Sequence, residues 1–299
     1  MNNAEKSASQ YLEDLGINTY PIDPFEICKS QEIKIFEESF YGLEGILLFD
    51  GYLAAIGLNS QQTYLKRRKF SVAHELGHLN MDVNIGEEKQ FLCTNKMIES
   101  FDLKNDIELR ADQFASELLM PKKMIKSFFN PVEPNWDAIQ KVSQEFDVSL
   151  MASAFKFVDT STVPCCLVVS KKGVIQFYKP SKFFKYSLQM RDSRIVANDT
   201  FAFKALKAET IPNDFDTVPA DIWISGYKVK RDSELLEWSL PLNSYGQVLT
   251  ILWDDETVDV EDLEEDADSD SYYVEEKNYS YDGVDNFPWE PPTLGKKKR

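Results

Sequence analysis

Histidine is almost absent from this 299-residue chain, which has only two, His74 and His78. Any site that needs three histidines is therefore excluded. Cysteine is also scarce: four residues form no C-x-x-C pair and no spacing typical of a disulfide framework. They are Cys28, Cys93, Cys165 and Cys166. We expect them to be core thiols in a reducing cytoplasm, with zinc ligation by cysteine the weaker alternative.

Long apolar runs are missing too. No stretch reaches the roughly 18 apolar residues that a membrane-spanning helix requires. The first residues, Met1 to Lys6, are not followed by the apolar segment of a signal peptide. These absences predict a cytoplasmic protein with no membrane association.

Positive charge is absent from one long segment. Between Asp254 and Glu276 there are thirteen acidic residues and no Lys or Arg, and removing them from the net charge of −17 leaves −4. The acidity thus belongs mainly to the C-terminal part of the chain. Because contact with phosphates needs cations, direct binding of nucleic acid is disfavoured.

Both histidines lie in one short motif, Phe70-Ser-Val-Ala-His74-Glu75-Leu-Gly-His78, within a helical pattern from Gln61 to Met81. A spacing of four residues is about one helical turn, so both imidazoles project from one face and can bind one metal ion. Glu75 lies on the flank of that face, where a carboxylate can act as general base toward a water on zinc. Two surface histidines on a charged helix are the alternative.

A hydrolytic zinc site usually has three protein ligands, so a third residue must be found. The best candidate is Glu108, in a second helical pattern from Asn105 to Pro121 that has an apolar stripe. Asp112 follows at i+4 on the same face and could accept the free ring N–H of a ligand histidine. On spacing alone, both could equally be solvated helix acids.

The two motifs together, HELGH at positions 74–78 and E-x-x-A-D-x-F-A-x-x-L-L-M-P at positions 108–121, resemble the ImmA/IrrE family of zinc metallo-endopeptidases. The resemblance covers about residues 1–160. It implies a zincin-like peptidase domain in which His74, His78 and Glu108 bind Zn²⁺ and Glu75 is the catalytic base. It also implies a protein substrate, typically a repressor with a DNA-binding helix-turn-helix. The family often has an acid where this chain has Arg110.

The segment before the motif predicts three strands, at 32–36, 45–49 and 52–58. Asp50-Gly51 joins the last two, and Asp-Gly between apolar runs is a strong hairpin signal. The strand at 52–58 leads directly into the motif helix. It could offer a free sheet edge for a substrate peptide, or it could be an ordinary edge or central strand.

Two features of the motif helix ask for an explanation. Gly77 costs about 1 kcal/mol relative to alanine inside a helix, which suggests close approach of another helix or of the substrate. The run Lys66-Arg67-Arg68-Lys69 is more readily a solvated helix face than a binding patch. As a patch, it could receive an acidic substrate or the acidic tail of this chain.

The rest of the chain is less informative. Residues 82–106 are polar and predict a loop with at most a short helix. Residues 136–158 predict two helices and a turn, but the second helix offers only Lys156 to bases, which favours a packing unit over a DNA reader. Strand patterns at 167–170, 174–178, 222–229, 234–240 and 247–253 predict a small antiparallel domain, with a helix near 199–208.

The expected fold class is α+β, in four segments. Residues 1–130 form a zincin-like metallopeptidase domain, 131–160 a helix-turn-helix-like extension, 161–255 a C-terminal α+β domain and 256–299 an acidic, disordered tail. The tail also carries aromatic residues, so it could dock on a partner or on the run 66–69.

The sequence thus predicts a zinc-dependent endopeptidase that cleaves a cytosolic protein, a transcriptional repressor or similar regulator. The alternative is a catalytically silent, zinc-stabilised module that binds a regulator. Glu75 separates the two, because a pure binding module has no need of a base beside its metal. Substrate identity, cleavage site, activating signal and oligomeric state do not follow from the sequence.

Overall fold

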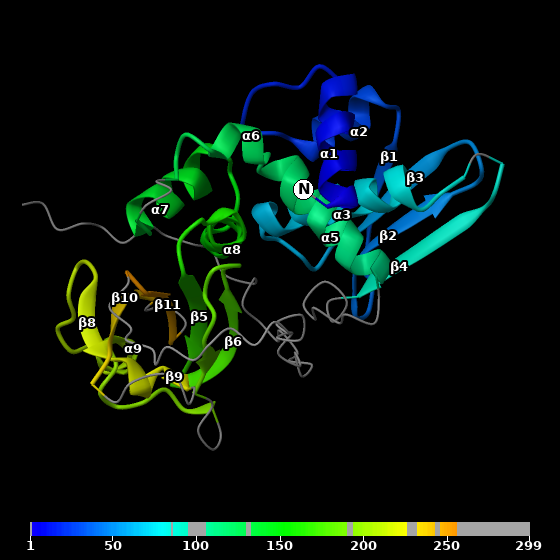
Figure 1. Ribbon diagram of the computed structural model, residues 1–299. Helices are drawn as coiled ribbons and strands as arrows, with labels where there is room; N and C mark the ends of the chain where they lie inside the picture. Colours follow the sequence, from blue (N-terminus) through cyan, green and yellow to red (C-terminus); the bar gives the residue numbers. More distant parts are fainter. Residues whose placement is uncertain are drawn as a thin grey trace, which may run out of the picture. The chain divides into compact units, whose positions relative to one another are not determined.

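The computed structural model describes residues 2–84, 86–94, 106–129, 133–189, 194–225, 232–242 and 246–255. Its described residues divide into two compact units, each treated separately here. The first contains residues up to Pro121 together with Ser143–Ser149, and the second contains Lys122–Val142 and the chain from Leu150 onward. The mixture of helices and sheets in both units is the α+β composition that the sequence predicts (Figure 1).

A four-stranded sheet in the order β1-β3-β2-β4 forms one layer of the first unit (Figure 1). Its strands are β1 (Lys34–Glu38), β2 (Leu43–Phe49), β3 (Ala54–Asn59) and β4 (Lys89–Thr94). β3 pairs in parallel with β1 and antiparallel with β2, so both its edges are used. The hypothesis that this strand offers a free edge to a peptide is therefore wrong. Within the described residues, β4 pairs only with β2 and ends that side of the sheet.

The described residues of this unit also form four helices: α1 (Asn3–Asp14), α2 (Pro24–Ser30), α3 (Leu65–Met81) and α5 (Asp106–Leu119). α1 begins at a capping box in which Asn2 and Glu5 each bond the other's backbone N–H. α2 begins at Asp23, with Pro24 at its first position. α3 packs against β2, β3 and α5, and α1 packs against α5 and α3. The motif helix therefore lies between the sheet and two other helices.

α3 and α5 approach each other most closely at Gly77. A Cβ atom there would lie 3.2 Å from both Cα of Ala111 and Cβ of Phe114. Because any larger side chain would push the helices apart, the glycine serves helix packing, one of the two uses that the sequence suggests. This close crossing sets Glu108 of α5 opposite the two histidines of α3.

Two expectations about local structure are wrong. The segment predicted as a loop between the two motif helices contains β4, which pairs with β2 from Phe49 to Leu43. Because most residues of this segment are polar, the sequence pattern does not indicate a strand, which forms through pairing with β2. The motif helix also begins at Leu65 rather than near Gln61. Asn59 Oδ1 accepts from the backbone N–H of Gln61 at 3.0 Å, and Asn59 Nδ2 donates to the carbonyl groups of Phe40 and Leu43, so this side chain holds a turn after β3 rather than the start of the helix.

The basic run at 66–69 is not a solvated face. Lys66 Nζ lies 2.8 Å from the carbonyl oxygen of Val148, and Lys69 Nζ lies 2.7 Å from Oδ2 of Asp147. Arg67 is buried and pairs with Glu44, and Arg68 pairs with Glu37. These cations hold the turn at 143–149 and the sheet, so they are occupied by the unit itself. The tail that was considered as their partner lies outside the described residues.

The second unit is built on a five-stranded antiparallel sheet in the order β6-β5-β11-β10-β8. Its strands are β5 (Cys165–Lys171), β6 (Val174–Pro180), β8 (Asp216–Pro219), β10 (Glu234–Leu242) and β11 (Gln247–Trp253). A two-stranded sheet joins β7 (Ser187–Leu188) and β9 (Ile224–Ser225), and α9 (Phe201–Leu206) packs on β10 and β11. Only Ile224–Ser225 of the strand expected at 222–229 is described as β structure, and residues 226–231 lie outside the described part.

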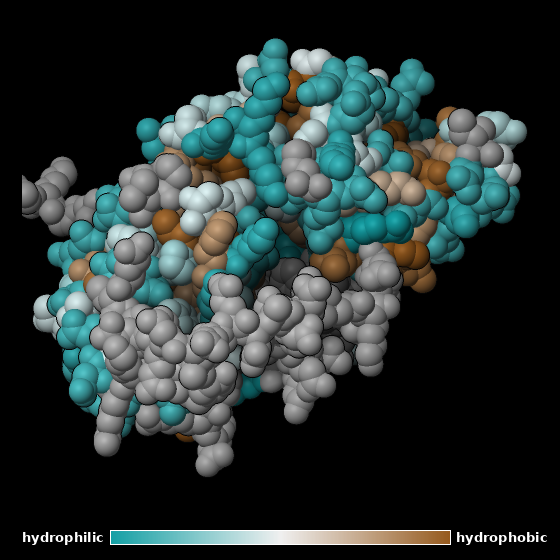
Figure 2. Space-filling model, in the orientation of Figure 1, coloured by the Kyte–Doolittle hydropathy of each residue, from teal (hydrophilic) through white to brown (hydrophobic). Residues whose placement is uncertain are grey.

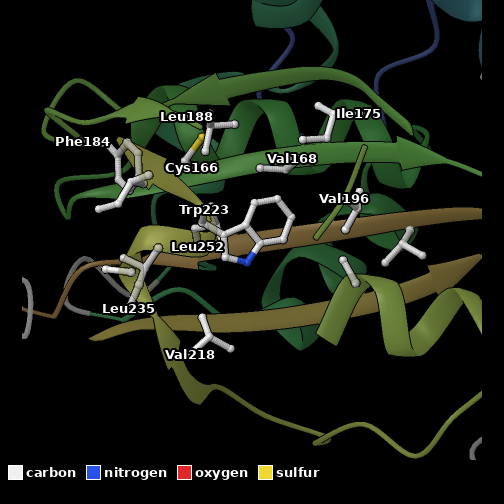
Figure 3. Close-up of a cluster of buried hydrophobic side chains, with 14 of the residues drawn as sticks. Cys166, Val168, Ile175, Phe184, Leu188, Val196, Val218, Trp223, Leu235 and Leu252 are labelled. Atoms are coloured by element: carbon white, nitrogen blue, oxygen red, sulfur yellow. The ribbon is translucent and has the colours of Figure 1, made fainter. Parts of the chain in front are cut away.

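The hydrophobic core of the second unit surrounds Trp223, whose indole is 2% exposed. Figure 3 shows this ring among side chains from the two sheets, with Val168 and Leu252 from neighbouring strands and Val196 from a loop. β5 and β11 are buried along most of their length, and their Val, Leu and Ile side chains contribute to the apolar surface removed from water.

Helices α6 (Lys122–Ile125), α7 (Trp136–Glu145) and α8 (Leu150–Thr160) follow α5. In α8, the candidate recognition helix, Lys156 is 2% exposed. Its only cation therefore cannot reach a base edge, which agrees with a packing role. Among the described residues, no helix combines the length and apolarity needed to cross a membrane.

Candidate metal centre

His74 and His78 occupy successive turns of α3, and both side chains are 0% exposed. Their Nε2 atoms lie 3.1 Å apart, and the rings cross at 78°. Two nitrogen lone pairs thus converge on one buried point. Without a shared cation or proton, such lone pairs would repel each other.

Glu108 from α5 completes the convergence. Its Oε2 lies 3.1 Å from Nε2 of His74 and its Oε1 lies 3.4 Å from Nε2 of His78. Ligand atoms about 2.1 Å from a tetrahedral zinc are separated from each other by roughly 3.4 Å. The three residues named by the sequence therefore have the donor types and mutual distances that zinc requires.

A second layer of carboxylates orients the two imidazoles. Nδ1 of His74 donates to Oδ1 of Asp112 at 2.9 Å, and Nδ1 of His78 donates to Oδ2 of Asp82 at 3.0 Å. With the hydrogen on Nδ1, each Nε2 presents its lone pair to the metal position. Arg110 donates to the other oxygen of Asp82 at 2.7 Å. Arg110 thus supports His78 through Asp82.

The electrostatics also favour a bound cation. Burial alone would lower the pKa of His78, but its hydrogen bonds with Asp82, Cys93 and Glu108 raise that pKa to about 11. For Glu108, burial raises the pKa, yet the bonds with the two histidines lower it to about 2. The carboxylates around the two histidines thus favour positive charge at this buried point, which a divalent cation can supply.

Glu75 lies beside this cluster in an unusual state. Its side chain is 0% exposed, and neither carboxylate oxygen has a hydrogen-bond partner among the described residues. Burial raises its pKa. The charges of His74 and His78 and the thiol of Cys93 beside it offset this increase in pKa only in part. A Cβ atom at Gly45 of β2 would lie 2.5 Å from its Oε1, so any larger residue at position 45 would force the carboxylate to move. A buried carboxylate with no geometric hydrogen bond points to a reaction or a ligand.

Two members of the site come from β4. The ring of Phe91 stacks on His78, with ring centroids 4.5 Å apart and planes at 13°. Cys93, two residues later on the same face of the strand, is 0% exposed. Its thiol and the metal-binding atoms of His74, His78 and Glu108 all lie within 4.8 Å of one another.

The sequence predictions missed three of these residues for different reasons. Asp82 stands at i+4 from His78, so helix spacing could have indicated it. Arg110 could only be placed once Asp82 was known. Cys93 carried no metal-binding spacing, and it reaches the site only because β4 pairs with β2 in one register, opposite Gly45.

Comparisons with known proteins agree with this geometry. Residues 28–157 match the family described as the IrrE N-terminal-like domain. Metallopeptidase ImmA of Bacillus subtilis is 32% identical over 105 residues, which are 34% of this chain and 56% of that protein. The chain thus spans about half the length of this curated relative. A solved Mycobacterium tuberculosis transcriptional regulator shares the fold, with a TM-score of 0.50, 12% identity and coverage of 84% of this chain and 76% of that one.

Proposed function

Because this chain belongs to the ImmA/IrrE family through residues 28–157, we propose that it is a zinc-dependent endopeptidase that cleaves a regulatory protein. One observation carries the proposal. Two histidine nitrogens and a glutamate converge at 3.1 to 3.4 Å, with a second, unpartnered glutamate buried beside them. This is the donor set of a hydrolytic zinc site together with its base.

We assign metal binding and proton transfer to different residues of the chain. His74, His78 and Glu108 would hold zinc, which when bound acidifies a water molecule and polarises the substrate carbonyl. Glu75 accepts the proton of the attacking water and returns it to the departing amide nitrogen. Its burial suits this role, because a raised pKa brings a carboxylate closer to the pH at which it must both take and release a proton.

We assign the docking of substrate to the outer edge of β4. Among the described residues this strand pairs only with β2, while Phe91 and Cys93 face the metal helix. An extended peptide that added to this edge would pass next to the metal position. Figure 2 shows hydrophobic surface in the region of this sheet. Leu48 of β2 and Leu92 of β4 are 37% and 48% exposed, on the sheet face opposite to Phe91 and Cys93, where alternate side chains of an added peptide strand would contact them.

The proposed class of substrate rests on family membership, and a transcriptional repressor is the first candidate. This chain itself is not proposed to bind DNA, because Lys156, the one cation of α8, is buried. Four free, buried cysteines suit the reducing cytoplasm in which such a repressor would be found.

The direct experiment compares new protein N-termini in cells that express the wild type or Glu75→Gln. Zinc content is measured in both purified proteins and must be equal. Fragments present only with the wild type would establish the peptidase and name its substrate. Identical fragment sets, under stress as well as in normal growth, would reject the proposal.

A second function competes because of one observation. Cys93 gives the site four possible protein ligands, and a closed set of four is typical of structural zinc. The chain would then be a zinc-stabilised module that binds a regulator without cleaving it. The buried Glu75 has no use in that reading, which is why we rank it second.

A further inference from the structure

Cys93 lies where it can bind the metal. Two contacts position β4, the strand that carries it. Cys93 pairs with Gly45 in the β2–β4 register, and the ring of Phe91 stacks on His78. These contacts aim the thiol at the point where the Nε2 atoms of His74 and His78 meet Glu108. The thiol is fully buried, so solvent does not compete for it.

Four protein ligands and a base for metal-bound water are compatible only if the site has two states. Two histidines, one glutamate and one thiolate fill a tetrahedral zinc ion and leave no position for water. Glu75, however, is placed as a base for that water and is buried without a hydrogen-bond partner. A structural site explains the cysteine but not Glu75, and an open catalytic site explains Glu75 but not the cysteine.

We propose that Cys93 is a displaceable fourth ligand of the metal, which keeps the peptidase latent until its sulfur is replaced by water. Closure forms one bond to sulfur, breaks one bond to water and releases the thiol proton to solvent. Opening reverses these three changes. The inference rests on the proposed peptidase function and adds regulation to the same site.

β4 gives the closed state a structural trigger. Within the described residues the strand is bonded to the sheet on one side only. A peptide that pairs with its other edge can shift the strand, and a shift of the strand moves Cys93 relative to α3. Substrate docking and opening of the site would then be coupled through one element.

Ligation is tested first, with a readout that does not depend on activity. The probe is the full-length protein loaded with Co²⁺ in place of zinc. The wild type should show the near-ultraviolet charge-transfer band of a cobalt–thiolate bond, and Cys93→Ala should lack it. Cys28→Ala is the matched control, because Cys28 is also free and fully buried in this unit but stands outside the cluster, so its variant should keep the band. X-ray absorption of the zinc form should show a sulfur at about 2.3 Å in the wild type and Cys28→Ala but not in Cys93→Ala.

Latency is tested by the yield of new protein N-termini in cells with equal amounts of each variant. Cys93→Ala should cleave about tenfold faster than the wild type or more, since a tenfold ratio needs only about 1.4 kcal/mol of ligand stabilisation. Cys28→Ala should match the wild type. The double variant Cys93→Ala, Glu75→Gln should be silent.

The outcomes separate this inference from the function on which it rests. A metal-loaded wild type without the thiolate band overturns the inference, and cleavage dependent on Glu75 would still stand. If the wild type shows the band and Cys93→Ala retains its metal but is inactive, both the latency inference and the peptidase function are overturned, in favour of structural zinc. The band with equal cleavage by the wild type and Cys93→Ala also rejects latency.

Discussion

Glu75 of the first unit and Glu237 of the second are both 0% exposed, yet their surroundings are opposite. Glu237 accepts from the backbone N–H of Ala202 at 2.6 Å, from Nε1 of Trp223 at 2.7 Å and from Oγ of Ser239 at 2.8 Å. Glu75 accepts from none of the described groups. The difference teaches that one buried carboxylate joins α9, the core tryptophan and β10, while the other is held ready for a ligand or a reaction.

The largest expected effect is on catalysis, through Glu75→Gln. Loss of the base should lower the cleavage rate by about 10² to 10⁴-fold. The free energy of unfolding should not fall, because no hydrogen bond is lost and a buried charge is removed. Cleavage is followed by mass spectrometry of N-termini, and stability by urea unfolding. A large loss of stability would show that Glu75 has a structural role like that of Glu237.

Glu237→Gln should show the reverse pattern. One amide N–H of glutamine must face either the indole N–H of Trp223 or the donors from Ala202 and Ser239, so the unfolding free energy should fall by about 3 kcal/mol. Metal content and cleavage by the folded fraction should not change. The exposed Glu234→Gln, on the same strand, is the control and should be neutral. Equal stability of the two variants would contradict the assigned bonding role.

Metal removal should affect only one of the two units. Zinc at a hundred times its dissociation constant stabilises the native protein by about 2.7 kcal/mol, and a chelator removes that stabilisation. Hydrogen exchange should therefore rise in α3 and α5, which carry the ligands, and stay the same in β5 and β11. Uniform deprotection of both units would show that metal binding is not confined to the first.

The smallest effect is expected for Asp82→Asn. This change weakens the orientation of His78 and breaks the pair with Arg110, so zinc affinity should fall about 10 to 100-fold without loss of the fold. Competition with a coloured chelator measures the affinity. Asp14→Asn, at the exposed end of α1, serves as control. Unchanged affinity would remove Asp82 from the site and leave Arg110 without a functional role.

Much of the first unit was predictable because its signals are local. The strands at 34–38, 43–49 and 54–59 and the two helices that carry the candidate metal ligands follow from periodicity over a few residues. The small domain after residue 165 follows in the same way. β4 was not predictable, since its six residues carry no apolar alternation strong enough to mark a strand without β2 beside it.

By itself the sequence determined which residues share a helix face. The spacing of His74, His78 and Glu75 on α3, and of Glu108 and Asp112 on α5, is a property of helical geometry and holds wherever the helices lie. That is why the candidate metal ligands, and the resemblance to a family of metallopeptidases, could be predicted without coordinates.

Only the tertiary structure decided what these faces meet. Contact at Gly77 brings the two helices together, and the register of β4 on β2 brings Cys93 to the metal position. Both depend on packing between segments distant in sequence, where a shift of one residue would turn a side chain to the opposite face. Local patterns carry no information on such registers, so the residue that we propose closes the site became visible only in the folded chain.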